Sequence, residues 1–98
     1  MLTSKQRAFL RSLANSEETI VHIGKGGIGE NIVKQTAEAL KARELVKCRV
    51  LENSPLDASE ACRELAEKTG ADGVQVIGTR FVLYKANPDS PVIKLPKK

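Results

Sequence analysis

The amino-acid sequence predicts one α/β domain, in which a single four-stranded mixed sheet packs with helices. Its 98 residues suit one domain and leave no room for a separate catalytic domain. Apolar residues recur at helical spacing in three segments, and four short apolar segments predict strands. The order is helix, strand, helix, strand, helix, strand, strand. Two strand–helix–strand crossovers imply parallel neighbouring strands, and a closing hairpin makes the sheet mixed.

The first helix is expected to begin at Ser4, because Thr3-Ser4-Lys5-Gln6 has the form of a capping box. It is expected to end near Asn15 or Ser16. Its apolar face is lined by Leu2, Phe9, Leu10, Leu13 and Ala14. Largely off this face lie Lys5, Arg7 and Arg11, and their spacing allows a basic stripe on the helix.

A first strand is expected over 19–23, and a glycine-rich turn joins it to a second helix over 28–42. A second strand follows over 45–51. Its apolar side chains alternate with Lys47 and Arg49, so one face of the strand is apolar and the other carries two cations. These cations belong either to a solvated sheet face or to a binding surface.

The third helix is expected to follow a second capping box, Asp57-Ala58-Ser59-Glu60, and to end at Gly70 as its C-cap. Its outward face carries Glu60, Glu64 and Glu67, and the simplest interpretation of these residues is a solvated helix face. This helix is therefore expected to point away from a polyanionic partner.

The last two strands are expected over 74–77 and 81–85, paired as an antiparallel hairpin through Gly78-Thr79-Arg80. From Asn87 the chain contains three prolines and ends in Lys97-Lys98. An extended and partly mobile tail is expected there, within one domain that spans residues 1–98.

Charge is distributed unevenly along the chain. The whole chain carries +4 with an isoelectric point near 9.3. Residues 1–51 hold nine basic and five acidic side chains, residues 52–72 hold two and six, and residues 73–98 hold five and one. Because the acidic segment coincides with the third helix, we expect one acidic flank and a basic remainder that favours polyanions.

The cysteine, histidine and aromatic residues limit the classes of function that the chain could have. Cys48 and Cys62 form no CxxC pair and lie on apolar faces, so buried reduced thiols in a cytosolic compartment are expected. The single histidine, His22, lacks partners for catalysis or metal binding and is expected to be structural. Tyr84 is expected to pack within the hairpin. The chain has only three aromatic residues, which argues against a base-stacking platform.

No signal-peptide run or membrane-spanning length is found in the sequence, which predicts a cytoplasmic protein without a membrane partner.

The run from Gly24 to Gly29 is the most informative segment. Unpaired N–H groups at a helix N-terminus attract anions, glycines allow close approach, and Lys25 adds a positive charge. The spacing of Gly24, Gly26 and Gly29 matches the dinucleotide-binding fingerprint, with Glu52 placed to hold a ribose. The shorter Gly-x-x-Gly spacing matches the loop by which some RNA-binding domains clamp a nucleic-acid backbone. A turn that needs positive φ and binds nothing is the third interpretation.

Four features in order resemble the CRM domain, named for chloroplast RNA splicing and ribosome maturation. They are the opening Leu2-Thr3-Ser4-Lys5-Gln6-Arg7, the glycine loop after the first strand, Val74-Gln75-Val76-Ile77-Gly78, and Val82-Leu83-Tyr84-Lys85. The resemblance extends from Leu2 to about Pro96, and a stand-alone copy of this length is similar to bacterial YhbY-like proteins. It implies a fold like the C-terminal domain of bacterial translation initiation factor three. Gly29 departs from the small polar N-capping residue expected at its position.

The resemblance also implies a function. It implies a non-catalytic module that binds RNA, with ribosomal RNA or pre-ribosomal particles of the large subunit as partner and no small-molecule substrate. The implied RNA-binding loop consists of Gly24, Lys25, Gly26 and Gly27. Basic side chains elsewhere are added as candidate RNA contacts, namely Lys5, Arg7, Arg11, Lys34, Lys47, Arg49, Arg80 and Lys85. No catalytic residue, metal site or cofactor is expected. The alternative is a nucleotide- or dinucleotide-binding protein that uses Gly24, Gly26, Gly29 and Glu52.

Overall fold

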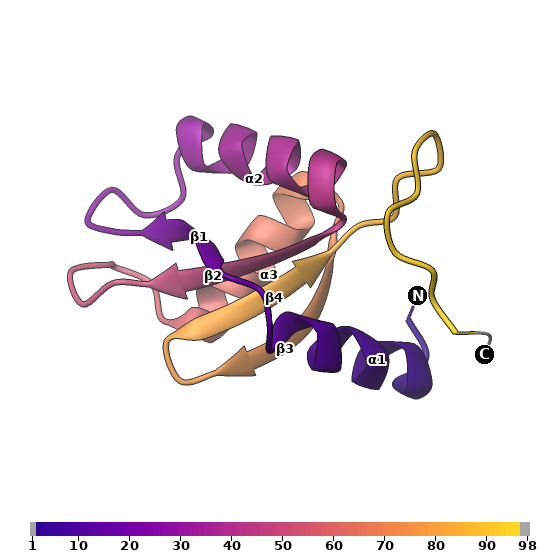
Figure 1. Cartoon of the computed structure of the whole chain (residues 1–98). Coiled ribbons are helices and arrows are strands. Elements are labelled where there is room, and N and C mark those ends of the chain that lie inside the picture. Colours follow the sequence, from indigo (N-terminus) through magenta and orange to yellow (C-terminus); the bar gives the residue numbers. More distant parts are fainter. Residues whose placement is uncertain (1, 97–98) are drawn as a thin grey trace.

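Three helices and four strands follow one another in the predicted order in a computed structural model that describes residues 2–96. The helices are α1 (Ser4–Ala14), α2 (Glu30–Arg43) and α3 (Ala58–Thr69). The strands are β1 (Thr19–Ile23), β2 (Leu45–Val50), β3 (Asp72–Ile77) and β4 (Arg80–Tyr84). The strands form one mixed sheet (Figure 1), which confirms the predicted fold class.

The strand order across the sheet is β1-β2-β4-β3. β1 and β2 are parallel neighbours, as predicted, whereas β4 is antiparallel to both β2 and β3. The expectation that β2 and β3 would be neighbours is therefore wrong. β4 occupies the central position because four of its five residues are buried, on both faces of the sheet, while β3 keeps an exposed end suited to an edge.

The two faces of the sheet are covered unequally. Helices α2 and α3 pack on one face, over a core that includes Val21, Cys48, Leu65 and Phe81. Helix α1 packs on the other face, where Leu10 contacts a second buried cluster. α1 covers only part of that face (Figure 1), so the sheet is uncovered beside the C-terminal ends of β1 and β2. We call this region the open face.

The helix ends follow their sequence signals closely. Thr3 accepts from the N–H of Gln6 at 3.1 Å, and the reciprocal contact completes the predicted capping box of α1. Asp57 and Glu60 form the second box at the start of α3, and Gly70 ends that helix in the left-handed conformation with φ of 73°. Helix α2 begins two residues later than expected, at Glu30, and its N-cap Gly29 supplies no side-chain hydrogen bond.

The segment 87–96 has no helix or strand, but it is attached to the domain. The backbone N–H groups of Asn87, Val92 and Ile93 donate to the buried carboxylate of Glu44, over 2.5 to 2.7 Å. Ile93 and Leu95 pack on the core cluster beneath α1. The tail, which was expected from the sequence to be partly mobile, therefore has partners in the domain, because three of its N–H groups donate to a carboxylate 43 to 49 residues away in the chain. Lys97 and Lys98 lie outside the described residues.

Both cysteines are buried and free, as predicted. Burial, reinforced by the charge of Cys62, raises the pKa of the Cys48 thiol to about 12. Burial also raises the pKa of Cys62. Since the reactive form of a cysteine is the thiolate, these two side chains act as core packing residues.

Candidate nucleic-acid interface

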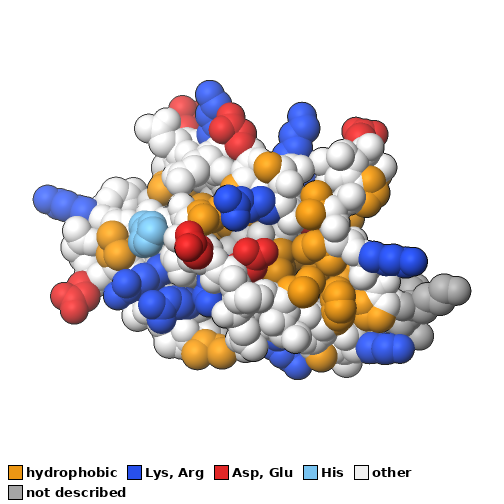
Figure 2. Space-filling view, viewed as in Figure 1, with side chains coloured by type: hydrophobic (Ala, Val, Ile, Leu, Met, Phe, Trp, Pro, Cys, Tyr) orange, Lys and Arg blue, Asp and Glu red, His pale blue; other side chains and the backbone are white. Residues whose placement is uncertain are grey.

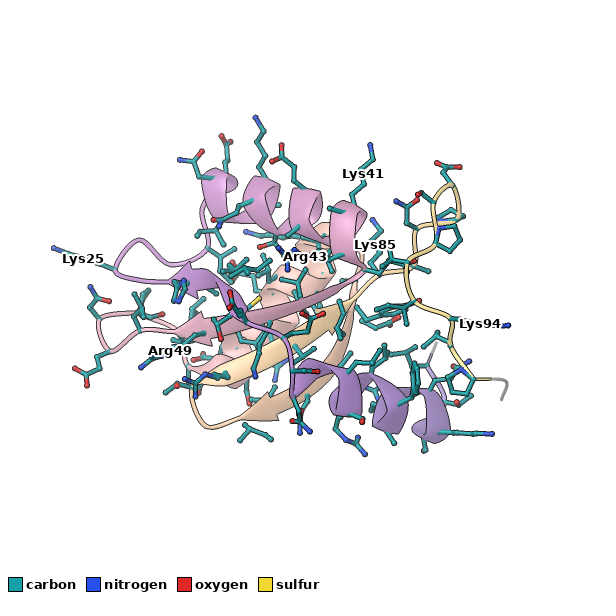
Figure 3. The ribbon with its side chains drawn as sticks, in the orientation of Figure 1. Lys25, Lys41, Arg43, Arg49, Lys85 and Lys94 are labelled. Carbon is teal, nitrogen blue, oxygen red and sulfur yellow. The ribbon has the colours of Figure 1, made fainter. Side chains whose placement is uncertain are left out.

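The Gly24–Gly27 segment forms a closed turn between β1 and α2. The N–H of Gly27 donates to the carbonyl of Gly24 at 3.0 Å, and Gly27 has a positive φ of 64°. Lys25 lies at the tip of this turn and extends away from the domain (Figure 3). Ile28 and Gly29 separate the turn from the first residue of α2. The turn thus precedes the helix N-terminus, whereas the sequence predicts it directly at that end.

The turn is supported from beneath and open at its tip. A Cβ atom at Gly24 would lie 3.6 Å from Oδ1 of Asn53, and one at Gly27 would lie 3.3 Å from Cγ of Pro55. The loop between β2 and α3 therefore packs alongside the glycine turn, at the same end of the molecule (Figure 1). A Cβ at Gly26 would meet nothing within 4 Å. The exposed tip, Lys25 and Gly26, is the part of the turn that a large ligand can approach.

Three side chains form a row across the strands of the open face. His22 of β1 is paired with Arg49 of β2, and Arg49 is paired with Arg80 of β4. All three are exposed, and Figure 2 shows a histidine beside several Lys and Arg side chains on this face. We call these residues the cross-strand row. Directly opposed like charges destabilise an antiparallel pair, so a bound anion would stabilise the Arg49–Arg80 pair.

Acidic side chains limit the extent of this cationic surface. Glu17 and Glu18 lie in the segment between α1 and β1 and are exposed. Acidic groups are visible on the same side of the molecule as the cationic cluster (Figure 2). The cationic surface is therefore a strip that includes the glycine turn and the cross-strand row, rather than a whole face of the molecule.

His22 is exposed on the open face and is not part of the core. Its neighbours Val21 and Ile23 are fully buried on the α2–α3 side, so alternation along β1 turns His22 to the open face. That alternation was already visible in the sequence and could have identified the residue. Gln75 and Ile77 of β3 also lie on the open face and were not predicted from the sequence. Their place on the open face depends on the β3–β4 register, which includes a bulge between Gly73 and Gln75.

Three of the predicted cations have partners inside the fold. Nζ of Lys47 donates to the carbonyl of Ala14 at 3.3 Å, and Nζ of Lys85 donates to the carbonyl of Thr69 at 2.9 Å. Both carbonyls end a helix, where such groups lack intrahelical partners. The guanidinium of Arg7 donates to the carbonyl of Gly73 in β3. These contacts give the three side chains a structural role that the sequence did not reveal.

The remaining predicted cations lie on helices. Lys34 borders a hollow with Ile28 and Gly29, close to the start of α2 and hence to the glycine turn. Lys5 and Arg11 belong to α1, the former exposed and the latter half-buried. The structure therefore brings Lys25, Lys34 and the cross-strand row toward one end of the molecule but does not gather all predicted cations there.

The acidic residues of α3 lie on the other side of the sheet. This helix packs on the face opposite the open face, and its Glu64 pairs with Lys68 at 3.2 Å. Glu60 is engaged in the capping box of the same helix. Most of the predicted acidic flank thus lies across the sheet from the cross-strand row, but Glu60 at the start of α3 lines a hollow together with Arg49.

The alternative dinucleotide site finds little support in this geometry. Such sites lie in a crevice between parallel strands, where the strand order reverses. Among the strands of residues 2–96, β1 is an edge strand whose one neighbour is β2, so the glycine turn is not flanked by parallel strands on both sides. Within residues 2–96, no group of three or more His, Cys, Asp or Glu side chains is placed to hold a metal ion. Over the same residues, none of the helices has the length and apolar character needed to cross a membrane.

Comparisons with known proteins agree with this description. The family model of the CRS1/YhbY (CRM) domain matches residues 2–85. A Bacillus subtilis protein named "Probable RNA-binding protein YqeI" is 45% identical over 96 residues, which cover 98% of this chain and all of that protein. A Haemophilus influenzae protein named "RNA-binding protein" is 31% identical over 97 residues, covering 99% and 97% of the two chains.

A solved structure supports the fold as well. The solution structure of a hypothetical protein from Staphylococcus aureus superposes with a TM-score of 0.81 at 46% sequence identity. The match covers 98% of this chain and all of the other chain. The resemblance inferred from the glycine loop and the flanking motifs is confirmed by the family match.

Proposed function

This chain belongs to the CRS1/YhbY (CRM) domain family, and from that membership we propose that it is a non-catalytic RNA-binding protein. Two relatives that match nearly its whole length are named as RNA-binding proteins. The observation that carries the proposal is the pairing of Arg49 with Arg80 on the open face, beside the glycine turn. A phosphate backbone would neutralise this opposed pair, while Lys25 would contact the same strand at the turn tip.

The chemistry of the strip fits a nucleic-acid backbone. Arginine guanidinium groups bind phosphate through two parallel hydrogen bonds, and lysine acts as a point charge. Base stacking contributes less, because Phe81 and Tyr84 are buried and Phe9 is half-buried. Binding is therefore dominated by charge, with Gly24–Gly27 allowing the backbone to approach the turn closely.

We further propose that the RNA is ribosomal RNA or its precursor in large-subunit particles, and that the protein acts in the cytoplasm. The resemblance to YhbY-like proteins supports this assignment. Crosslinking in cells followed by sequencing of the bound RNA tests it. Reads concentrated on large-subunit ribosomal RNA support the proposal, and reads spread over messenger RNA contradict it.

Binding through the turn is tested by measuring RNA affinity for two variants. We expect Lys25→Ala to weaken binding by removing one phosphate contact. We expect Gly26→Asp to weaken it more, because a carboxylate would face the phosphate. A charge-assisted hydrogen bond contributes about 1–3 kcal/mol, which sets the scale for each change. Both variants should melt like the parent, since Lys25 is exposed and a Cβ at Gly26 meets nothing within 4 Å.

Two matched controls accompany these variants. Gly26→Ala adds a side chain at the same position without a charge. Lys94→Ala removes an exposed lysine at the opposite end of the molecule (Figure 3). Both should bind RNA like the parent. If Gly26→Asp also binds RNA like the parent, the glycine turn is only a connection between β1 and α2.

A further inference from the structure

A hollow lies on the open face, beside the C-terminal end of α1. It has a volume of about 210 Å³ and is lined by residues of α1, the following Asn15, β2, β3 and β4. Ala14 and Val82 contribute buried apolar groups to it. The hollow is separate from the glycine turn but shares Arg80 with the cross-strand row. It is therefore continuous with the proposed RNA surface.

One wall of the hollow is an apolar side chain that the fold leaves uncovered. Ile77 is 63% exposed, the largest exposure among the large hydrophobic residues of the sheet. In the β3–β4 register it is paired with Arg80, and Gln75 is paired with Val82. Directly paired residues present their side chains to the same face of a sheet. Ile77 and Gln75 therefore stand together at the edge of the hollow on the open face.

The polar groups of the hollow are two amides and two cations. Asn15 and Gln75 line it, and among the hydrogen bonds of residues 2–96 neither side-chain amide has a protein partner. Each amide offers one acceptor and two donor hydrogens. Lys47 also lines the hollow and is held by its bond to the carbonyl of Ala14. Arg80 completes the set from β4.

This combination is typical of a site for a small flat group with polar edges. Apolar walls with a few polar groups are characteristic of ligand sites. Unpaired bases in RNA offer their Watson–Crick edges to side-chain amides and their faces to apolar groups. The cations at the rim suit the phosphates on either side of such a base. A base inside a duplex could not enter, because its edge is paired.

Resting on the RNA-binding function proposed above, we propose that this hollow takes one unpaired nucleobase of the bound RNA. Ile77, Ala14 and Val82 contact the base, and the amides of Asn15 and Gln75 bond to its edge. Arg80 holds one flanking phosphate, and Lys47 donates to the other with an ammonium hydrogen that is not used in its bond to the carbonyl of Ala14. The protein then prefers single-stranded RNA over a duplex of equal length, even though it presents no aromatic platform.

The experiment compares three RNA probes of 12 nucleotides. They are a mixed-sequence single strand, the same strand with abasic sites throughout its central half, and the fully paired duplex. The parent is expected to bind the single strand about tenfold more tightly than the abasic strand. A difference of this size corresponds to roughly one or two hydrogen bonds together with the apolar contact of the base. The duplex is expected to bind more weakly than the single strand.

Two variants locate the effect in the hollow. Gln75→Ala and Ile77→Ser should reduce the preference for the base-bearing strand over the abasic strand by several fold, on the order of one lost hydrogen bond or apolar contact each. The matched control is Val76→Ser on the same strand. Val76 is 41% exposed and is paired with Phe81 on the other face, so its replacement should leave the preference unchanged.

The outcomes separate this inference from the proposed function. Equal affinity of the parent for the single strand and the abasic strand overturns the base site. So does tighter binding to the duplex, or an unchanged preference in both hollow variants. If the parent binds none of the three probes but binds ribosomal RNA, the base site is overturned and the RNA-binding function stands. If it binds neither the probes nor ribosomal RNA, both proposals are overturned.

Discussion

Gly26 and Gly27 are adjacent in the turn but have different physical requirements. Gly27 has φ of 64°, a conformation that costs an L-residue about 1–2 kcal/mol. A Cβ there would also lie 3.3 Å from Cγ of Pro55. Gly26 has neither constraint. We expect Gly27→Ala to lower the free energy of unfolding by about that amount, and Gly26→Ala to leave it unchanged or raise it slightly. Urea denaturation of the two variants checks this, and equal destabilisation would contradict the assigned turn geometry.

Glu44 links the end of α2 to the C-terminal segment. Burial of its carboxyl raises its pKa, but hydrogen bonds from the backbone N–H groups of Asn87, Ile93 and Val92 lower it by more in total. The pKa in the folded chain is therefore below the ordinary value of 4.5. The residue also has a positive φ of 64°, which is uncommon for a side chain other than glycine. The three backbone N–H groups that donate to its carboxylate hold the residue in this conformation.

The lowered pKa predicts how stability depends on pH. The folded chain binds the proton of Glu44 less readily than the unfolded chain, so this stabilisation is fully present above pH 4.5 and is lost as the pH falls through the folded pKa. We expect Glu44→Gln to reduce stability at pH 7, by about 1–3 kcal/mol. Its deficit relative to the parent should shrink as the pH falls below 4.5. Thermal melts of both proteins from pH 7 to 3 check this, and a constant difference would exclude the carboxylate as the cause.

At the scale of the elements, α3 tests the placement of the interface. The triple change of Glu60, Glu64 and Glu67 to Gln should leave specific RNA binding nearly intact, because α3 packs on the sheet face opposite the cross-strand row. Glu60 shares a hollow with Arg49, and its replacement by a neutral glutamine removes no contact to phosphate. Glutamine can still accept the capping-box hydrogen bond at position 60. The exposed Glu64–Lys68 pair contributes less than about 1 kcal/mol, so melting should change little. Nonspecific RNA binding should rise slightly through lost repulsion. A large loss of affinity with unchanged melting would place α3 in the interface.

The local signals of the elements could be predicted, whereas their order in the sheet could not. Capping boxes at Thr3 and Asp57 and the C-cap at Gly70 each depend on a few adjacent residues, and all three are found as predicted. The insertion of β4 between β2 and β3 depends on pairing over distances of more than thirty residues along the chain. The continuous apolar run of β4, from Phe81 to Tyr84, was the available signal for a central strand.

The charged residues of the candidate site could be predicted from the sequence, but which of them lie together on one surface could not. The glycine turn and Lys25 are local features of the sequence, as is the alternation that exposes Arg49. The row that joins His22, Arg49 and Arg80 requires the register of three strands. The internal roles of Lys47 and Lys85 require knowing which helix ends they approach. The sequence therefore identifies the cations, and only the fold shows which of them bond to the ends of helices.

At the scale of the whole molecule, the strip of cations predicts a steep dependence of RNA affinity on salt. The domain extends 39 Å along its longest axis, with Lys25 and Lys94 at opposite ends (Figure 3). For single-stranded RNA, the logarithm of affinity should fall linearly with the logarithm of salt concentration, by about 0.7 for each phosphate contacted. Replacing a cation of the strip should reduce this slope by about that amount, and Lys94→Gln should leave it unchanged.

Arg80→Gln distinguishes a binding role from a structural one, because the two roles predict opposite signs for stability. If Arg80 binds RNA, its replacement should lower the RNA affinity and the dependence of that affinity on salt. The change would also remove the repulsion between Arg80 and Arg49, which should raise the free energy of unfolding by about 0.2–1 kcal/mol. If Arg80 stabilises the sheet, the same change should lower that free energy. Filter binding at several salt concentrations measures the RNA affinity, and urea denaturation of the same protein preparation measures the free energy of unfolding. Lower stability with an unchanged salt slope would remove the cross-strand row from the RNA surface and leave the glycine turn as its remaining anchor.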